Sequence, residues 1–169
     1  MLPEIFRILI ITLSDRAFNG IYEDRSGPAV EELVKGFFTR MVWACRTERI
    51  ILPDDAAMLH ENLTKAINEF EIIFTTGGTG IGPRDITVDT VKPLLVKEIP
   101  GIMEYIRIKY GASKPSALLS RGVAGVAGKS LIYTLPGSEK AVNDYMEEIT
   151  RSLAHTLEML YGIDSHRKH

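Results

Sequence analysis

The sequence predicts an α/β fold in which helices cover both faces of a parallel or mostly parallel sheet. Three observations carry this prediction. Apolar, β-branched runs of strand length alternate with longer segments whose apolar residues recur at helical spacing. Turn-forming residues separate the two kinds of segment. The length of 169 residues is enough for one domain with a substantial core and too short for two ordinary domains.

The predicted elements follow in order along the chain. Strands are expected at residues 6–13, 49–52, 70–74 and 130–135, with two further β-like stretches at 117–119 and 123–126. Helices are expected at residues 28–39, 56–68, 87–97 (beginning at 87 or 88), 102–110 and 141–160. Pro28 suits the first position of the first helix, and either Asp54 or Asp55 caps the second helix.

Composition excludes several classes of protein. The chain is 45% apolar and 25% charged, which is ordinary for a globular protein and excludes disorder and collagen-like repeats. Its net charge is −2, with a basic block only at the tail, so the electrostatic footprint of a nucleic-acid-binding protein is missing. The apolar run at residues 5–13 is too short to span a bilayer and contains Arg7, so we expect no membrane segment and no signal peptide. A lone cysteine, Cys45, fits a reducing compartment, the cytoplasm.

The most informative segment is the glycine-rich run TTGGTGIGPRD at residues 75–85, which follows the predicted strand at 70–74. Four glycines within six positions let the backbone leave the strand sharply and approach a ligand closely. Consecutive amides in such a turn form an anion-binding nest, and the threonines add hydroxyl donors. Arg84 and Asp85 close the segment, which favours a site for phosphate and metal. A plain structural turn is the alternative. The dinucleotide-binding fingerprint does not fit, because Pro83 stands where its third glycine is required.

A second glycine-rich segment, residues 122–130, resembles a P-loop at its Gly128-Lys129-Ser130 end. The motif requires a glycine five residues before Gly128, and Val123 stands there. A P-loop also joins a strand to a helix, whereas the residues from Lys129 onward have the pattern of a strand. We therefore do not expect a P-loop here.

Polar side chains gather where the predicted strands end. In open α/β sheets ligands bind beyond the carboxyl ends of the strands. Residues 14–15, 53–55, the glycine run and residues 136–138 are all expected at that edge. Clustered carboxylates repel one another unless a cation lies among them. The expected occupant is Mg²⁺ with a nucleoside triphosphate, because Mg²⁺ prefers carboxylate, water and phosphate oxygens.

Several of these residues also have a structural interpretation. One of Asp54 and Asp55 is needed as a helix cap, which leaves the other free. Asp24 lies in a loop where aspartate favours turns, and Arg84 can simply pair with a neighbouring carboxylate. Ser138 is expected to cap the last helix, whose N-terminus would still be an anion site.

Taken in order, the motifs resemble those of one known family. The segments that carry the resemblance are residues 14–15, 23–27, 53–54, 75–87, 100–101, 119–121, 125, 128 and 135–138. Together they resemble the molybdopterin adenylyltransferases of molybdenum-cofactor synthesis, a family that includes MogA-like and MoaB-like enzymes and the G domain of gephyrin-type proteins. The resemblance extends from Ile8 to about Leu160. It is most specific in the glycine run followed by Pro-Arg-Asp-Ile-Thr.

The resemblance implies a three-layer α/β/α fold, one domain at residues 1–162 with a polar tail at 163–169, and a homotrimer. The implied reaction is adenylyl transfer from ATP to the terminal phosphate of molybdopterin, with Mg²⁺ and with release of pyrophosphate. Asp54 and Asp85 are the implied catalytic acids and metal ligands. Implied nucleotide contacts are Thr76, Gly77, Gly78, Thr79, Gly80, Pro136, Gly137 and Ser138, and implied pterin or phosphate contacts are Ser14, Asp15, Asp24, Arg84, Ser120 and Arg121.

The chain departs from the family pattern at two places. Val88-Asp89 stand where the family commonly has Pro-Glu, which weakens a proline-initiated helix but keeps an acid in its first turn. Ala127 stands where the family often has an arginine, which could serve an anion or a trimer contact. Two alternatives to catalysis stay open: a module that binds pterin or nucleotide without reaction, and a trimeric scaffold. The presence of Asp54 and Asp85 favours catalysis, since a scaffold has no use for clustered acids.

Overall fold

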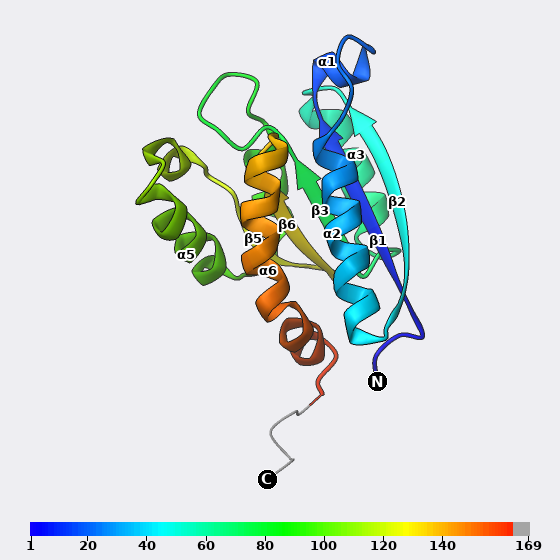
Figure 1. Cartoon of the computed structure of the whole chain (residues 1–169). Coiled ribbons are helices and arrows are strands. Elements are labelled where there is room, and N and C mark those ends of the chain that lie inside the picture. The colour runs from blue at the N-terminus through cyan, green and yellow to red at the C-terminus, as the bar shows by residue number, and fades with distance from the viewer. Residues whose placement is uncertain (164–169) are drawn as a thin grey trace.

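Six strands form a single sheet at the centre of the molecule (Figure 1). The structure is a computed structural model that describes residues 1–163, so the expected polar tail at 163–169 lies outside the described residues except for Ile163. The strand order is β2-β1-β3-β6-β5-β4. The strands are β1 (Ile5–Leu13), β2 (Ala44–Leu52), β3 (Ile72–Thr76), β4 (Lys97–Glu98), β5 (Ala124–Ala127) and β6 (Ser130–Leu135).

The sheet is mostly parallel, as predicted. Strands β2, β1, β3 and β6 run parallel to one another, whereas β5 runs antiparallel to β6 and β4 runs antiparallel to β5. Central parallel strands are covered on both faces, which requires apolar residues at nearly every position. Accordingly, all five residues of β3 are buried.

Helices lie on both faces of the sheet, which confirms the three-layer α/β/α fold (Figure 1). The helices are α1 (Asp15–Phe18), α2 (Ser26–Met41), α3 (Ala56–Ala66), α4 (Thr87–Val91), α5 (Pro100–Gly111) and α6 (Glu139–Leu160), with two 3₁₀ helices, η1 (Lys92–Leu94) and η2 (Pro115–Leu119). Successive residues of a strand point to opposite faces. In β1, Phe6, Ile8 and Ile10 therefore pack with α2, α5 and α6, while Leu9 and Ile11 pack with α3 and α4.

Two predictions for the segment after the glycine run are wrong. The helix predicted at 87–97 ends at Val91 and continues as η1, because Pro93 has no N–H for the helical hydrogen bond. Residues 97–98 form the short strand β4 instead. The β-like stretch predicted at 117–119 belongs to η2, which begins at Pro115.

Other boundaries differ in ways that affect the site. The second strand begins at Ala44 rather than residue 49 and pairs with β1 over its full length. Helix α2 begins at Ser26, so Pro28 occupies its third position, where its missing N–H would have had no intrahelical partner. The four-residue helix α1, directly after β1, was not predicted. Among residues 1–163, no helix combines the length and hydropathy needed to cross a bilayer.

Candidate active site

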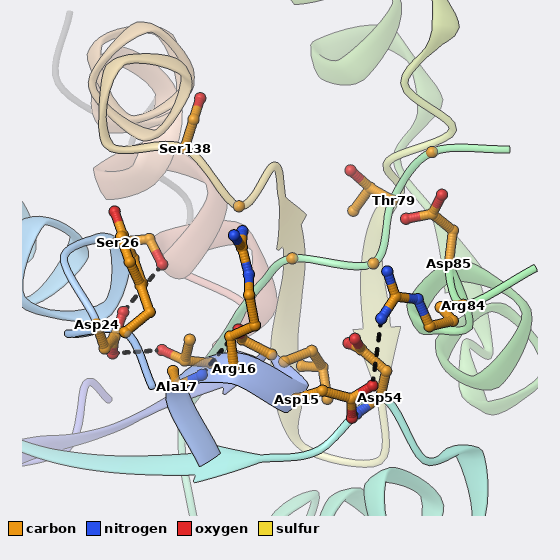
Figure 2. Close-up of a pocket in the computed structure, with 18 of the residues that line it drawn as sticks. Asp15, Arg16, Ala17, Asp24, Ser26, Asp54, Thr79, Arg84, Asp85 and Ser138 are labelled. Carbon is orange, nitrogen blue, oxygen red and sulfur yellow. Dashed lines mark hydrogen bonds and ion pairs between the residues drawn. The ribbon is translucent and has the colours of Figure 1, made fainter. Parts of the chain in front are cut away.

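A cleft of about 730 Å³ lies at the carboxyl ends of the parallel strands. Four parts of the chain line it: the end of β1 with α1 and the loop to α2, the loop after β2, the glycine run after β3, and the turn after β6 (Figure 2). Of the residues singled out from sequence, those that line this cleft are Ser14, Asp15, Asp24, Asp54, Gly77, Gly78, Thr79, Gly80, Arg84, Asp85, Gly137 and Ser138.

Four of the residues singled out do not line the cleft. Thr76 ends β3, and its hydroxyl donates to the Pro136 carbonyl at 2.8 Å. Pro136 and Ser120 line a neighbouring pocket instead. Arg121 lies behind the glycine run, and its side chain bonds to that segment and to Asp89.

Asp54 is the free member of the Asp54-Asp55 pair. The Asp55 carboxylate caps α3 by accepting from the Met58 amide at 2.8 Å. Asp54 thus has no capping role, and its own amide donates to Asp15 Oδ1 at 2.9 Å. Burial raises the pKa of the Asp54 carboxyl, and the neighbouring charges of Asp15 and Asp85 add to the increase, while a hydrogen bond from the Asp15 backbone and the charge of Arg84 partly offset it. The ionised carboxylate is therefore partly desolvated in the free protein, which favours a bound cation.

Asp85 reaches the cleft from the far end of the glycine run. Its Oδ2 accepts from the Gly82 amide at 2.7 Å, which fixes the carboxylate against the loop. A Cβ atom at Gly80 would lie 2.7 Å from the same oxygen, so only glycine allows this approach. In Figure 2 the Arg84 side chain lies between Asp54 and Asp85.

Arg84 is held only loosely. Its Nη1 lies 3.6 Å from Asp15 Oδ2, and its side chain is 77% exposed. An exposed ion pair at that distance contributes at most about 1 kcal/mol. The guanidinium is therefore free to leave Asp15 for an anion that enters the cleft.

The glycine run turns its amides toward the cleft because its carbonyls are bonded behind it. The Gly77 carbonyl accepts from the Thr87 hydroxyl at 2.7 Å, and the Gly78 carbonyl accepts from the Thr87 amide at 3.1 Å. The carbonyls of Thr79 and Gly80 accept from the Arg121 amide and Nε, each at 2.9 Å. In a trans peptide the N–H points opposite to the C=O. The amide that follows each of these four carbonyls therefore points away from Thr87 and Arg121. An anion-binding nest requires this orientation.

Two glycines of this run are required by the backbone. Gly77 and Gly78 have φ angles of 99° and 67°, in the region that side chains disfavour. A Cβ at Gly77 would also overlap the Leu13 carbonyl, and one at Gly78 would overlap Thr87 Oγ1. The sharp turn after β3 thus depends on both residues.

Asp24 combines a place on the cleft wall with a structural role. Its Oδ2 accepts from the Thr12 hydroxyl at 2.8 Å, and its Oδ1 accepts from the Ser26 hydroxyl at 3.1 Å and the Gly27 amide at 3.0 Å. These bonds tie the start of α2 to β1. Asp24 therefore holds the wall in place, with both carboxylate oxygens already in use.

The pocket that adjoins the cleft has a volume of about 480 Å³ and shares Thr79, Gly80 and Ser138 with it. Its other walls come from α5, η2, α6 and the loops beside them, and include Tyr110, Lys114, Ser116, Ser120, Pro136, Lys140 and Tyr145. Burial raises the pKa of the Tyr145 hydroxyl, and nearby Ser120 partly offsets this. That hydroxyl makes no hydrogen bond of normal length within the described part of the chain. The pocket therefore holds a buried hydroxyl that is available to a ligand.

Sequence reasoning missed two arginines at the cleft. Arg16 comes from α1 and extends into the cleft in Figure 2, with its guanidinium 5.5 Å from the centre of the Tyr22 ring. Arg25 precedes α2 and also lines the cleft. The motif at residues 23–27 contained Arg25 but gave no reason to separate it from other surface arginines. Arg16 could not be singled out because it lies on α1, and that helix is too short to produce a periodic pattern in the sequence.

The donors of this cleft fit Mg²⁺. Residues 1–163 contain no cluster of three or more His, Cys, Asp or Glu side chains arranged for a metal. Mg²⁺ does not need one, because it is commonly bound by one or two carboxylates together with water and substrate phosphates. Asp54, with its partly desolvated carboxylate, and Asp85 supply such a pair.

These features define the class of protein: a three-layer α/β protein with a glycine-rich loop and two acids in a cleft at the carboxyl edge of its sheet. Comparison with known proteins gives the family. Residues 9–155 match the family described as the probable molybdopterin binding domain, and the chain belongs to this family. The resemblance inferred from the sequence is thereby confirmed.

Individual relatives agree with this assignment. The chain is 32% identical over 161 residues to the molybdopterin adenylyltransferase of Helicobacter pylori strain J99, covering 94% of this chain and 90% of that protein. It is 37% identical over 155 residues to the Drosophila melanogaster molybdenum cofactor synthesis protein cinnamon, where the match covers 89% of this chain but spans only 25% of the relative. The crystal structure of the molybdopterin biosynthesis enzyme MoaB from Thermus thermophilus superposes with a TM-score of 0.82 at 35% identity, covering 93% of this chain and 97% of that one.

Proposed function

We propose that this protein transfers an adenylyl group from ATP to the terminal phosphate of molybdopterin, releasing pyrophosphate. The observation that carries the proposal is the meeting of Asp54, Asp85 and the glycine run in one cleft. Membership of the molybdopterin-binding family and the similarity to molybdopterin adenylyltransferases support the choice of substrates.

The reaction needs groups that neutralise negative charge on the phosphates rather than a protein nucleophile. An oxygen of the pterin phosphate attacks the α-phosphorus of ATP, and the bond from that phosphorus to the pyrophosphate oxygen breaks. Two anions must approach each other, and catalysis comes from positioning and from stabilising the developing charge. Mg²⁺ held by Asp54 and Asp85 would neutralise part of that charge. Arg84 exchanges its weak contact with Asp15 for a phosphate oxygen.

The loop amides act on the phosphates without rearrangement. Their orientation is set in advance by the bonds to Thr87 and Arg121. Preorganised donors aimed at developing charge are commonly the largest contribution to catalysis, and removing one costs about 10²–10³ in kcat. We assign the ATP phosphates to this loop and the Gly137-Ser138 turn.

The neighbouring pocket is the place we assign to the pterin. It meets the cleft at Thr79, Gly80 and Ser138, so a ligand there can direct its phosphate toward ATP. The buried Tyr145 hydroxyl and the side chain of Ser120 offer polar contacts for the ring system. Of the residues predicted as pterin or phosphate contacts, Ser120 fits the pterin, whereas Ser14 and Arg84 fit the phosphates. The Asp15 carboxylate would repel a phosphate, and it accepts instead from the Asp54 amide.

The test is a reconstituted reaction of the purified protein with molybdopterin, α-labelled ATP and Mg²⁺. We expect pyrophosphate release and labelled adenylylated pterin. Asp54→Asn and Asp85→Asn should each lower kcat by at least about 10²-fold, comparable to losing a group that acts on the transition state. Glu61→Gln, on the exposed face of α3, is the matched control and should leave kcat unchanged. Binding of both substrates without pyrophosphate release would instead support the non-catalytic module.

We also propose that the enzyme works as a homotrimer in the cytoplasm. Exposed apolar side chains on α5 and η2, which are Tyr105, Ile108, Leu118 and Leu119, support an interface between copies. The lone Cys45, which is free, suits a reducing compartment. Light scattering on the purified protein tests the trimer, and Ile108→Glu should shift it toward monomer.

A further inference from the structure

Arg121 binds the second half of the glycine run, residues 79–85, at both of its ends. Its amide and Nε donate to the Thr79 and Gly80 carbonyls, and its Nη2 donates to the Asp85 carbonyl at 3.2 Å. Arg121 lines neither the cleft nor the neighbouring pocket. Arg121 therefore links the two ends of the loop at residues 80–85 on the side that does not line the cleft.

Asp89 holds the guanidinium in that position. Arg121 Nη1 and Nη2 donate to Asp89 Oδ1 and Oδ2 at 3.0 and 2.8 Å, a bidentate arrangement. The guanidinium keeps the pKa of Asp89 below its ordinary value. Asp89 lies in the first turn of α4 and does not line the cleft. It occupies a position at which this chain departs from the Pro-Glu of the family pattern, yet it keeps the carboxylate.

The loop presents two groups to the cleft. Thr79 and Asp85 both face it in Figure 2. The Asp85 carboxylate accepts from the Gly82 amide, so its position depends on the shape of residues 80–85. Anything that opens these residues moves both the carboxylate and the amides that face the cleft.

From these contacts we propose that Arg121 and Asp89 form a clamp that positions Asp85 and the loop amides for adenylyl transfer. Both are positioning residues: neither touches a substrate. The inference rests on the proposed function, and it replaces the expectation that Arg121 contacts the pterin or a phosphate. Because a misplacement of about 1 Å can cost 10²-fold in rate, breaking the clamp should slow the reaction rather than weaken binding.

The experiment compares Arg121→Gln, Asp89→Asn and the double variant in steady-state assays. Each single variant should lower kcat by about 10–100-fold, with KM for molybdopterin changed by less than about twofold. The double variant should be no slower than Arg121→Gln, because both changes break one unit. Asp89→Glu keeps the carboxylate and should recover most of the lost rate.

The matched control is Glu71→Gln. Arg7 donates from Nη2 and Nε to the two Glu71 carboxylate oxygens at 2.9 and 3.4 Å. This arginine–carboxylate pair lies at the amino ends of β1 and β3, away from the cleft. If the clamp acted only through general stability, this control would lower kcat as well. We expect it to leave kcat unchanged.

Amide hydrogen exchange gives a readout that does not depend on activity. Exchange at Gly82, whose amide bonds to Asp85, should become at least about tenfold faster in Arg121→Gln and Asp89→Asn and stay unchanged in Glu71→Gln. Normal exchange and normal kcat in Asp89→Asn would overturn the clamp. A raised KM for molybdopterin with unchanged kcat in Arg121→Gln would overturn it too, in favour of a ligand contact. An inactive wild-type protein would refute the proposed function. The exchange rates would still show whether Arg121 and Asp89 hold the loop.

Discussion

The two glycine-rich segments of this chain have similar glycine contents and different places in the fold. Residues 75–85 leave the carboxyl end of β3 and line the cleft. Residues 122–130 include the turn at Gly128-Lys129 between the antiparallel strands β5 and β6, which lies at the amino end of β6. Gly128 also has a positive φ of 56°, but it packs against Ile67 rather than beside acids. The place of a turn in the sheet, more than its glycines, decides whether it can bind a ligand.

The strongest test of this contrast is a matched pair of substitutions, Gly78→Ala and Gly128→Ala. Both force a side chain into a positive φ and a close contact, so each should destabilise the fold by about 1–3 kcal/mol. Only Gly78→Ala distorts the anion-binding loop, so it alone should lower kcat, by at least about 10²-fold. Thermal unfolding and kinetics on both variants provide the measurement. Equal losses of kcat in the two variants would show that the two turns do not differ in their importance for catalysis.

A smaller effect is expected at Arg84. Arg84→Gln removes a charge that is 77% exposed and only weakly paired, so the melting temperature should not change measurably. Loss of one charge-assisted contact to a phosphate should lower kcat/KM for ATP by about 10–100-fold. The wild-type advantage should shrink as salt is added, because an exposed charge is screened. A salt-independent effect would argue against a direct phosphate contact.

Asp54→Asn should raise the stability of the free protein. A carboxyl whose pKa is raised in the folded state contributes stability below its unfolded pKa and loses it as pH rises through the folded pKa. The variant should therefore melt higher than wild type at pH 7, with each kcal/mol worth about 2–4 °C, and the difference should vanish near pH 3–4. Thermal melts from pH 3 to 8 would check this sign.

Binding of Mg²⁺ and ATP should reverse the order of stability of the wild-type protein and Asp54→Asn. Mg²⁺ and ATP together should stabilise the wild-type protein more than Asp54→Asn, since the variant lacks one of the proposed metal ligands. An equal stabilisation of both by Mg²⁺ and ATP would remove Asp54 from the metal site.

The smallest effect is expected at Lys129, which would be the phosphate-binding lysine if residues 122–130 formed a P-loop. Lys129 is exposed in the turn between β5 and β6, away from the cleft. Lys129→Met should leave KM for ATP and kcat within about twofold of wild type, because ordinary surface changes perturb a protein by less than about 0.5 kcal/mol. A marked rise in KM for ATP would revive the P-loop interpretation.

Much of the fold could be read from the sequence because local patterns specify it. The apolar run at residues 6–13 predicted a strand, and β1 (Ile5–Leu13) confirms it. Ser138 was expected to cap α6, and its hydroxyl accepts from the Ala141 amide. Predictions failed where a proline ended a helix early, at Pro93, and where α1 was too short to be periodic. These are the places where one or two residues outweigh a pattern.

By itself, the sequence determined the layers of the fold, the family and the residues that gather at the carboxyl edge of the sheet, because periodicity and motif spacing are local properties of the chain. Only the tertiary structure decided which of Asp54 and Asp55 is free, since that depends on the cap of α3. It alone showed that the Arg121 side chain bonds to the backbone of the glycine run. Arg121 lies 41 residues from Gly80 along the chain, and their contact comes from the folding of distant segments against each other, which no local pattern encodes.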